Sequence, residues 1–182
     1  MHNKVVVINN ELKLTQLTKS DHQQVRKLMT VVYPPPYLHI WKDDASWYLE
    51  MVYNKTNFEK EIDHPDSYYY FIIYNEKPIG VLRVCYNQTL IDHPDKKATK
   101  LHRIYIDQSI HGKGIGKILL QWVEGQCKER KDEILWLEAM DTQQQALKFY
   151  ESNGFEICGS MRLDFEIMLP EYRGMHRLYK TL

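Results

Sequence analysis

Three glycines at alternate positions form the feature of this sequence that is best suited to binding chemistry. They lie in the segment HGKGIGK (111–117), and they are Gly112, Gly114 and Gly116. Glycine lets the backbone approach a ligand closely and adopt positive φ angles. The segment runs into a helical pattern, and the first amides of a helix lack partners and carry the positive end of its dipole. With Lys113 and Lys117 beside them, these amides predict a phosphate site.

Two familiar glycine loops do not match the segment. A P-loop needs GxxxxGK followed by Ser or Thr, whereas Ile118 follows Lys117 here. The dinucleotide fingerprint needs GxGxxG, whereas these glycines are spaced GxGxG. A turn that only reverses the chain is the alternative interpretation. Three glycines at a strand-to-helix junction, flanked by two lysines, favour phosphate binding over that alternative.

The elements next to the segment are expected to hold it in place. KLHRIYID (100–107) predicts a strand that ends just before the loop. Apolar residues at helical spacing follow the loop, and they are Ile115, Ile118, Leu119, Trp122 and Val123. This stripe predicts an amphipathic helix whose first amides face the loop.

The remaining elements are a mixture of strands and helices. A hairpin is expected over 4–17, and a helix follows a capping box of Ser20 and Gln23. Three prolines at 34–36 are expected to end that helix. Further along we expect a helix over 43–55, a strand pair over 67–87, a strand over 133–140, a helix from the N-cap Thr142 to the stop at Asn153-Gly154, and strands over 155–169 and 175–182. Together they predict one α/β or α+β domain over residues 1–182.

The composition excludes several classes of protein. Twenty-four basic residues balance twenty-four acidic ones, so the charge gives no general attraction for nucleic acid or anionic membranes. Cys85, Cys127 and Cys158 are far apart, which predicts reduced thiols in a cytoplasmic protein. The sequence has no HExxH and no His/Cys cluster, so no metal is expected. No apolar run approaches the roughly 18 residues of a membrane span.

Two segments resemble motifs of the GNAT superfamily of acetyl-CoA-dependent N-acetyltransferases. His111–Gly116 is similar to the signature Gln/Arg-x-x-Gly-x-Gly/Ala: both required small residues match, while His111 replaces Gln or Arg and can still donate a hydrogen bond. ALKFYESNGF (146–155) resembles the family's helix that ends in Tyr and then Gly-Phe. The resemblance implies a mixed, mostly antiparallel central sheet of about seven strands, flanked by about four helices.

The resemblance also implies where coenzyme A binds. Its pyrophosphate is expected on the amides of 112–117. Its pantetheine arm is expected along the fourth strand, where the fourth and fifth strands splay apart. Gln143 stands where the family often has Asn. The residues expected to contact the donor are Ile104, Tyr105, Ile106, His111, Gly112, Lys113, Gly114, Ile115, Gly116, Lys117 and Gln143.

The implied reaction moves an acetyl group from a thioester to an amine. An amine with a pKa near 10.4 needs about 4.6 kcal/mol to be neutral at pH 7, so a base or desolvation must help. His102 and Glu138 are the candidate bases, directly or through water, and Asp141 is a third. The alternative is a hydrogen-bonded structural histidine and solvated carboxylates. A backbone amide near Ile106 is the expected oxyanion donor.

Tyr150 is the candidate that protonates the leaving thiolate. A phenol of pKa about 10 can serve a thiolate of pKa about 8.5. The alternative is that Tyr150 packs with Phe149 in the core. Lys148 is either a phosphate contact or a solvated residue on the helix surface.

The acceptor site is expected in the segment 31–44. Tyr33, Tyr37 and Trp41 are predicted to form an aromatic wall for a cationic amine, with Asp43 and Asp44 as partners for ammonium groups. The alternative is that the aromatic residues belong to the core and the aspartates cap a helix.

The preferred acceptor is a small amine, and LHRIYID…GKGIGK resembles polyamine-acetylating members of the superfamily. Acetylation of a protein N-terminus or lysine is a second interpretation. A coenzyme A-binding module without transfer activity is a third, and a homodimer stays open.

Overall fold

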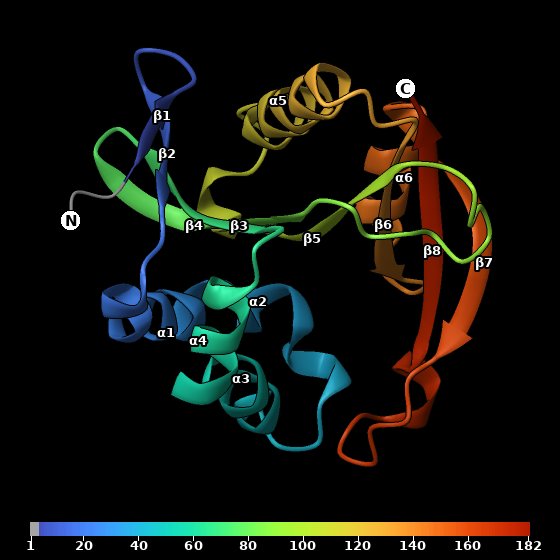
Figure 1. The fold of residues 1–182 in the computed structure, drawn as a ribbon. Helices are drawn as coiled ribbons and strands as arrows, with labels where there is room; N and C mark the ends of the chain where they lie inside the picture. The colour runs from blue at the N-terminus through green and yellow to red at the C-terminus, as the bar shows by residue number, and fades with distance from the viewer. Residues whose placement is uncertain (1–3) are drawn as a thin grey trace. The chain divides into compact units, whose positions relative to one another are not determined.

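The computed structural model describes residues 4–182, which form two compact units. The first comprises 4–84 and 103–116, and the second comprises 85–102 and 117–182. Strand β5 (Ala98–Ile106) contributes to both units, because the boundary falls between His102 and Arg103 (Figure 1).

The first unit holds the strands β1 to β5, in that order along the sheet. Besides β5 they are β1 (Val5–Val7), β2 (Leu12–Gln16), β3 (Ser67–Tyr74) and β4 (Lys77–Cys85). β2 pairs antiparallel with both β1 and β3. Leu12 and Leu14 are buried while Lys13 is half-buried, which is the alternation of a strand with one face on the core. The predicted hairpin over 4–17 is confirmed.

The helices of the first unit gather on one side of its strands (Figure 1). They are α1 (His22–Val32), α2 (Pro34–Tyr37), α3 (Ser46–Tyr53) and α4 (Lys55–Asp63). Val25, Met29 and Val32 of α1 are buried, as their spacing predicts.

One local prediction in this unit is wrong, and two are confirmed with changes in detail. The capping box is formed by Thr18 and Asp21 at the short helix Lys19–Asp21, just before the predicted residues. The helix α1 ends at Val32, just before the prolines, as predicted. The prolines also begin α2, because proline is tolerated in the first turn of a helix, where its missing N–H has no partner to lose. The helix expected over 43–55 ends at Tyr53, and Asn54 caps α4 by accepting a hydrogen bond from Asn57 N at 2.8 Å.

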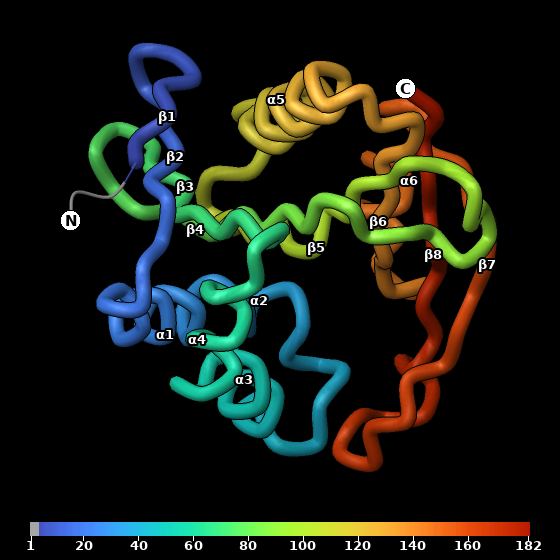
Figure 2. The backbone as a smooth tube through the Cα atoms, in the orientation of Figure 1, coloured from blue at the N-terminus to red at the C-terminus, as the bar shows by residue number. Residues whose placement is uncertain are grey.

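The second unit continues the strand order as β5-β6-β8-β7, and these strands can be followed in Figure 2. Its further strands are β6 (Ile134–Met140), β7 (Glu156–Arg162) and β8 (Gly174–Thr181). β5 pairs parallel with β6, whereas β8 pairs antiparallel with β6 and β7. The helices are α5 (Ile115–Glu129), which starts at the end of the first unit, and α6 (Gln144–Ser152).

Two predictions in the second unit need correction. The strand expected over 155–169 ends at Arg162. The N-cap of α6 is Gln143, not Thr142, and its side chain makes no capping hydrogen bond. The predicted stop is confirmed, since Asn153 is the C-cap and Gly154 has a φ of +85°.

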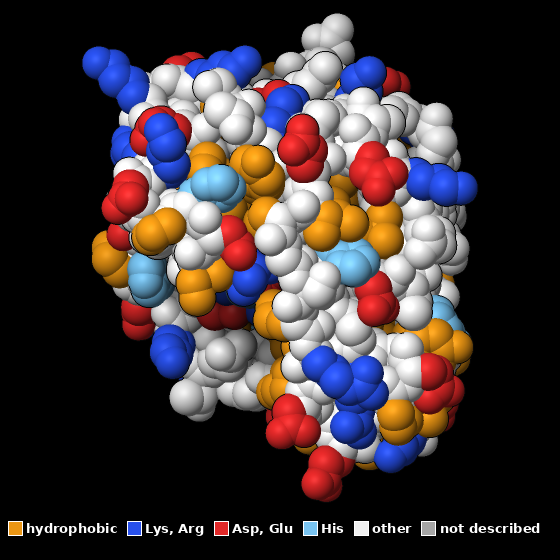
Figure 3. All heavy atoms as spheres, turned by 90° about the vertical axis from the view of Figure 1, so that its right-hand side faces the viewer, with side chains coloured by type: hydrophobic (Ala, Val, Ile, Leu, Met, Phe, Trp, Pro, Cys, Tyr) orange, Lys and Arg blue, Asp and Glu red, His pale blue; other side chains and the backbone are white. Residues whose placement is uncertain are grey.

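The fold class is confirmed as a mixed, mostly antiparallel α/β arrangement. Residues 4–182 hold eight strands and six α-helices, against the expected seven and four. The single domain over 1–182 stays a prediction. On the face drawn in Figure 3, acidic and basic side chains are interspersed, in keeping with the zero formal charge.

Candidate functional site

The glycine loop lies between β5 and α5. After β5, Asp107 accepts hydrogen bonds from the backbone and the hydroxyl of Ser109, at 2.9 and 2.7 Å, and α5 begins at Ile115. Gly112 and Gly114 have φ angles of +84° and +74°, which side chains rarely allow. A Cβ at either glycine would meet no other atom within 4 Å. The positive φ angles explain why these positions are glycine, and the empty space beside them leaves the loop open to a ligand.

Two side chains of the loop have partners in the first unit. Nε2 of His111 lies 3.2 Å from the Ile106 carbonyl oxygen, to which it donates. The Lys113 ammonium lies 5.4 Å from the ring centroid of Tyr74, at the end of β3. A cation over an aromatic face keeps N–H donors that point away from the ring. Lys113 is thus held beside the loop with donors left for an anion.

An aromatic cluster lies where α1, α2, α3 and β5 meet in the first unit. Three tyrosine rings form a stack, with Tyr33 4.7 Å from Tyr37 and 4.4 Å from Tyr48. Tyr105 of β5 packs its edge against Tyr33 and Tyr37, and its hydroxyl lies 3.2 Å from that of Tyr48. We call Tyr33, Tyr37, Tyr48 and Tyr105 the tyrosine cluster.

The residues of the tyrosine cluster and the neighbouring Trp41 differ in how exposed they are to a ligand. Tyr33 is 3% exposed and Trp41 is 5% exposed, and Trp41 Nε1 donates to the Tyr33 hydroxyl at 3.1 Å. These two residues are core, so the predicted wall cannot include their faces. Tyr37, Tyr48 and Tyr105 are half-buried. Sequence reasoning missed Tyr48, although its position one turn before Val52 on a helix was visible.

Burial also sets the chemistry of these hydroxyls. It raises the pKa of Tyr37 to about 12 and moves the pKa values of Tyr33 and Tyr105 well above the usual tyrosine range. Neighbouring tyrosines raise them further. The hydroxyls of Tyr33, Tyr37 and Tyr105 therefore stay neutral at physiological pH and offer dipoles, not charge.

The two aspartates after Trp41 have different roles. Asp43 Oδ2 accepts from Trp47 N at 2.7 Å and lies 3.2 Å from the Ser46 hydroxyl, so it caps α3. For Asp43 the structure thus supports the alternative interpretation, in which the aspartate caps a helix. Asp44 is exposed at the turn before α3 and has a φ of +56°.

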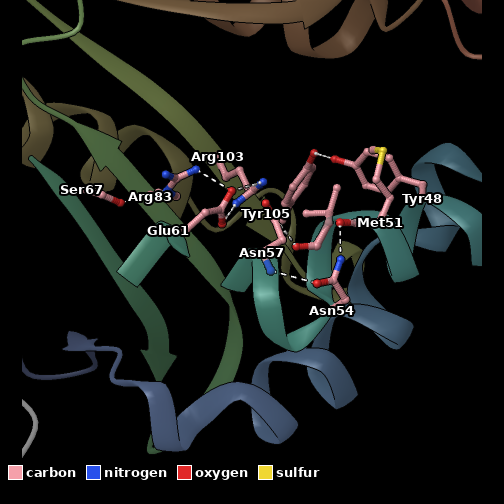
Figure 4. A network of polar contacts seen from close by, with 10 residues as sticks. Tyr48, Met51, Asn54, Asn57, Glu61, Ser67, Arg83, Arg103 and Tyr105 are labelled. Atoms are coloured by element: carbon pink, nitrogen blue, oxygen red, sulfur yellow. Dashed lines mark hydrogen bonds and ion pairs between the residues drawn. The ribbon is translucent and has the colours of Figure 1, made fainter. Parts of the chain in front are cut away.

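A buried ionic network lies next to the tyrosine cluster (Figure 4). Glu61 of α4 accepts from Arg83 of β4 at 2.7 Å and from both terminal nitrogens of Arg103 at 2.6 and 2.9 Å. Nε of Arg83 also donates to the Ser67 hydroxyl at 3.0 Å. The network fixes α4 to β4 and β5. It joins residues far apart in sequence, so no local pattern could reveal it.

The second unit contains the candidate bases. His102 is half-buried in its part of β5. Glu138 of β6 accepts from Lys100 Nζ at 2.7 Å, and this ammonium lies 4.4 Å from the Trp136 ring centroid. The Glu138 carboxylate therefore already has a charged partner within the second unit. Asp141 has one carboxylate oxygen buried without a hydrogen-bond partner.

The other candidates of the second unit lie on or beside α6. Tyr150 is 9% exposed, and its ring contacts Phe149 and Phe155 edge-on, with centroids 5.2 and 5.7 Å apart. Its ring thus packs as the alternative interpretation expects, which still allows a role for the hydroxyl. Gln143 lies at the start of α6, and Lys148 is exposed.

Within residues 4–182, no group of three or more His, Cys, Asp or Glu residues could hold a metal ion. No helix in the same range is long and apolar enough to cross a membrane. The three cysteines are free thiols.

A relative and three solved structures are similar to this chain. An uncharacterized N-acetyltransferase encoded in the pepI 3′ region of Lactobacillus delbrueckii subsp. lactis is 28% identical over 112 residues, which is 62% of this chain. The match spans 65% of that relative's length.

The solved structures share the fold. The PaiA N-acetyltransferase of Thermoplasma acidophilum, in complex with coenzyme A, matches with a TM-score of 0.70 at 17% identity, over 94% of this chain and 99% of that one. An acetyltransferase of Salmonella typhimurium that modifies the N-terminal serine of ribosomal protein L7/L12 matches with a TM-score of 0.72 at 18% identity. The match covers 98% of this chain and 99% of that one. A point mutant of the spermidine N-acetyltransferase SpeG of Vibrio cholerae matches with a TM-score of 0.65 at 17% identity, over 95% of each chain.

The family model for the acetyltransferase (GNAT) family matches residues 24–155, which include the glycine loop, β5 and Tyr150. This match covers well over half of the chain. The chain therefore belongs to the acetyltransferase (GNAT) family, whose enzymes are acetyl-CoA-dependent acyltransferases.

Proposed function

We propose that this chain transfers the acetyl group of acetyl-CoA to a primary amine. The observation that carries the proposal is the loop geometry in a member of this family. Gly112 and Gly114 adopt positive φ angles beside open space, directly before a 15-residue helix. Such a loop accepts a pyrophosphate on its amides, and side chains at these positions would obstruct it.

The residues of the loop would divide the binding of the donor between them. The backbone amides of Gly112 to Lys117 would hold the pyrophosphate, with Lys113 and Lys117 supplying positive charge. Ile104, Tyr105 and Ile106 of β5 would pair with the pantetheine arm through their backbone. Gln143 would contact the same arm. The coenzyme A complex of the Thermoplasma relative supports this donor for the fold.

The transfer itself needs three groups of this chain. The amine nitrogen attacks the thioester carbonyl carbon, and the carbonyl oxygen takes up the electron pair. The Ile106 amide would donate to that oxygen. The C–S bond then breaks, and the Tyr150 hydroxyl would give its proton to the departing thiolate. The proton lost by the amine would pass to a base, directly or through water.

His102 is the base that we prefer. Glu138 already accepts a hydrogen bond from Lys100 at 2.7 Å, whereas histidine is the side chain that most often serves as a general base. Replacing His102 by Gln would then remove the acidic limb of the rate profile, while Glu138→Gln would leave that limb in place.

A small cationic amine is the proposed acceptor. The half-buried rings of Tyr37, Tyr48 and Tyr105 offer neutral aromatic surface, and a desolvated cation on such a surface gains about 2 kcal/mol. The spermidine acetyltransferase of the same fold supports this class. The ribosomal-protein acetyltransferase of the same fold supports the second class, a protein N-terminus.

Coenzyme A release from acetyl-CoA tests the proposal. Spermidine, a simple monoamine, a peptide with a free N-terminal serine and an N-acetylated lysine peptide are compared as acceptors. We expect release to depend on an amine and to be fastest with spermidine. Faster release with the serine peptide would move the acceptor to the second class. Donor binding without release for any amine would leave a coenzyme A-binding module.

A further inference from the structure

Gly80 is a buried glycine in the interior of β4. A glycine at such a position often marks a close approach by another backbone. A Cβ at Gly80 would lie 1.9 Å from the carbonyl oxygen of Tyr105 and 2.9 Å from its carbonyl carbon. It would also lie 3.1 Å from the Ile106 Cα. These are backbone atoms of β5, so no side-chain rotation can relieve the overlap, and only glycine fits here.

The contact with Gly80 fixes the orientation of the peptide group between Tyr105 and Ile106. Its carbonyl oxygen points at Gly80. In a trans peptide the C=O and the following N–H point in opposite directions, so the Ile106 N–H points away from Gly80. The neighbouring groups are anchored as well, because Asp107 N donates to Ile79 O at 2.7 Å and His111 donates to Ile106 O at 3.2 Å.

We propose that Gly80 is a positioning residue for acetyl transfer. Because Gly80 has no side chain, the Tyr105 carbonyl can point toward β4. The Ile106 N–H of the same peptide group then points away from β4, where it can serve as the oxyanion donor. The inference rests on the proposed function, in which that amide stabilises the charge on the thioester oxygen. A side chain at position 80 would push the peptide back and turn the donor away.

Gly80→Ala tests the inference by separating kcat from donor binding. Loss of one oxyanion donor lowers kcat by about 10²-fold or more. We expect that loss, with the acetyl-CoA Kd within about threefold of wild type. Gly125→Ala is the matched control, because a Cβ at Gly125 meets nothing within 4 Å, and its kcat stays at the wild-type value. A Gly80→Ala enzyme with wild-type kcat would overturn the inference.

A second measurement needs no variant. Tyr105-Ile106 is the single Tyr-Ile pair in the sequence, so ¹³C-carbonyl tyrosine and ¹⁵N-isoleucine label one amide for NMR. We expect the Ile106 amide proton to shift with acetyl-CoA more than with free coenzyme A, since only the former carries the carbonyl. Equal shifts in a protein that binds and turns over acetyl-CoA would overturn the Ile106 amide as the oxyanion donor and, with it, the role of Gly80, while acetyl transfer itself would stand. Absence of acetyl-CoA binding by calorimetry would overturn the proposed function and this inference together.

Discussion

Gly114→Ala separates ligand binding from the conformational need for glycine. Gly114 has a φ of +74°, where a side chain costs roughly 1–2 kcal/mol. Nothing lies within 4 Å of a Cβ at this position, so no steric cost is added in the free protein. This loss is small against the roughly 5–15 kcal/mol that stabilise a domain, so the variant stays folded. The new methyl group lies on the open side, where we expect the pyrophosphate.

Calorimetry with acetyl-CoA measures the effect. We expect Kd to rise at least tenfold, which corresponds to about 1.4 kcal/mol of binding free energy. Gly154→Ala is the control for backbone strain, because Gly154 has a φ of +85° and only the Lys180 side chain near it. Both variants lose similar free energy of unfolding, but only Gly114→Ala loses affinity. Wild-type affinity in a folded Gly114→Ala protein would refute the phosphate-loop interpretation.

The other predictions concern single side chains and metal dependence. Tyr150→Phe lowers kcat by roughly 10²–10⁴ without changing donor affinity, if its hydroxyl protonates the thiolate; an unchanged rate in single turnovers would exclude that role. Trp41→Ala lowers the free energy of unfolding by about 3–5 kcal/mol, because Trp41 is buried and hydrogen-bonded to Tyr33. A fully stable variant in which only the acceptor KM rises would instead show that Trp41 contacts the acceptor. Burial raises the pKa of Cys127 to about 12, above the roughly 8.5 of an unfolded thiol, so the folded state holds this proton more tightly. Stability in denaturant titrations therefore falls as pH rises through about 8.5 to 12, and a Cys127→Ala protein shows less of this fall. EDTA leaves coenzyme A release unchanged; a loss that a divalent ion restores would reveal a metal site.

The glycine loop and the helix after it were predictable because their signals are local. Positive φ, a free helix N-terminus and the apolar stripe of α5 each depend on residues close in sequence. The hairpin β1–β2 and the stop at Asn153-Gly154 were visible for the same reason.

The errors arose where local signals compete. Thr18 and Ser20 both suit a cap, and only the fold selects Thr18. The prolines of 34–36 end α1 as predicted, but they also begin α2, which the sequence analysis did not expect.

The core of the acceptor region needed the structure. Tyr33 and Trp41 look like surface aromatics in an irregular segment, yet Tyr33 stacks between Tyr37 and Tyr48. The Glu61 network and the contact between Gly80 and Tyr105 join separate elements, so no local pattern names the partners of either.

Steady-state release of coenzyme A tests the central claim most directly. Wild-type protein, Gly114→Ala and Gly154→Ala are each mixed with acetyl-CoA and spermidine, and the free thiol is followed over time. Amine-dependent release by the wild type and by Gly154→Ala, with a strongly reduced rate for Gly114→Ala below saturation, is the predicted result. Release that does not depend on an amine, or that is unaffected by Gly114→Ala, would contradict transfer of an acetyl group from a donor held on the glycine loop.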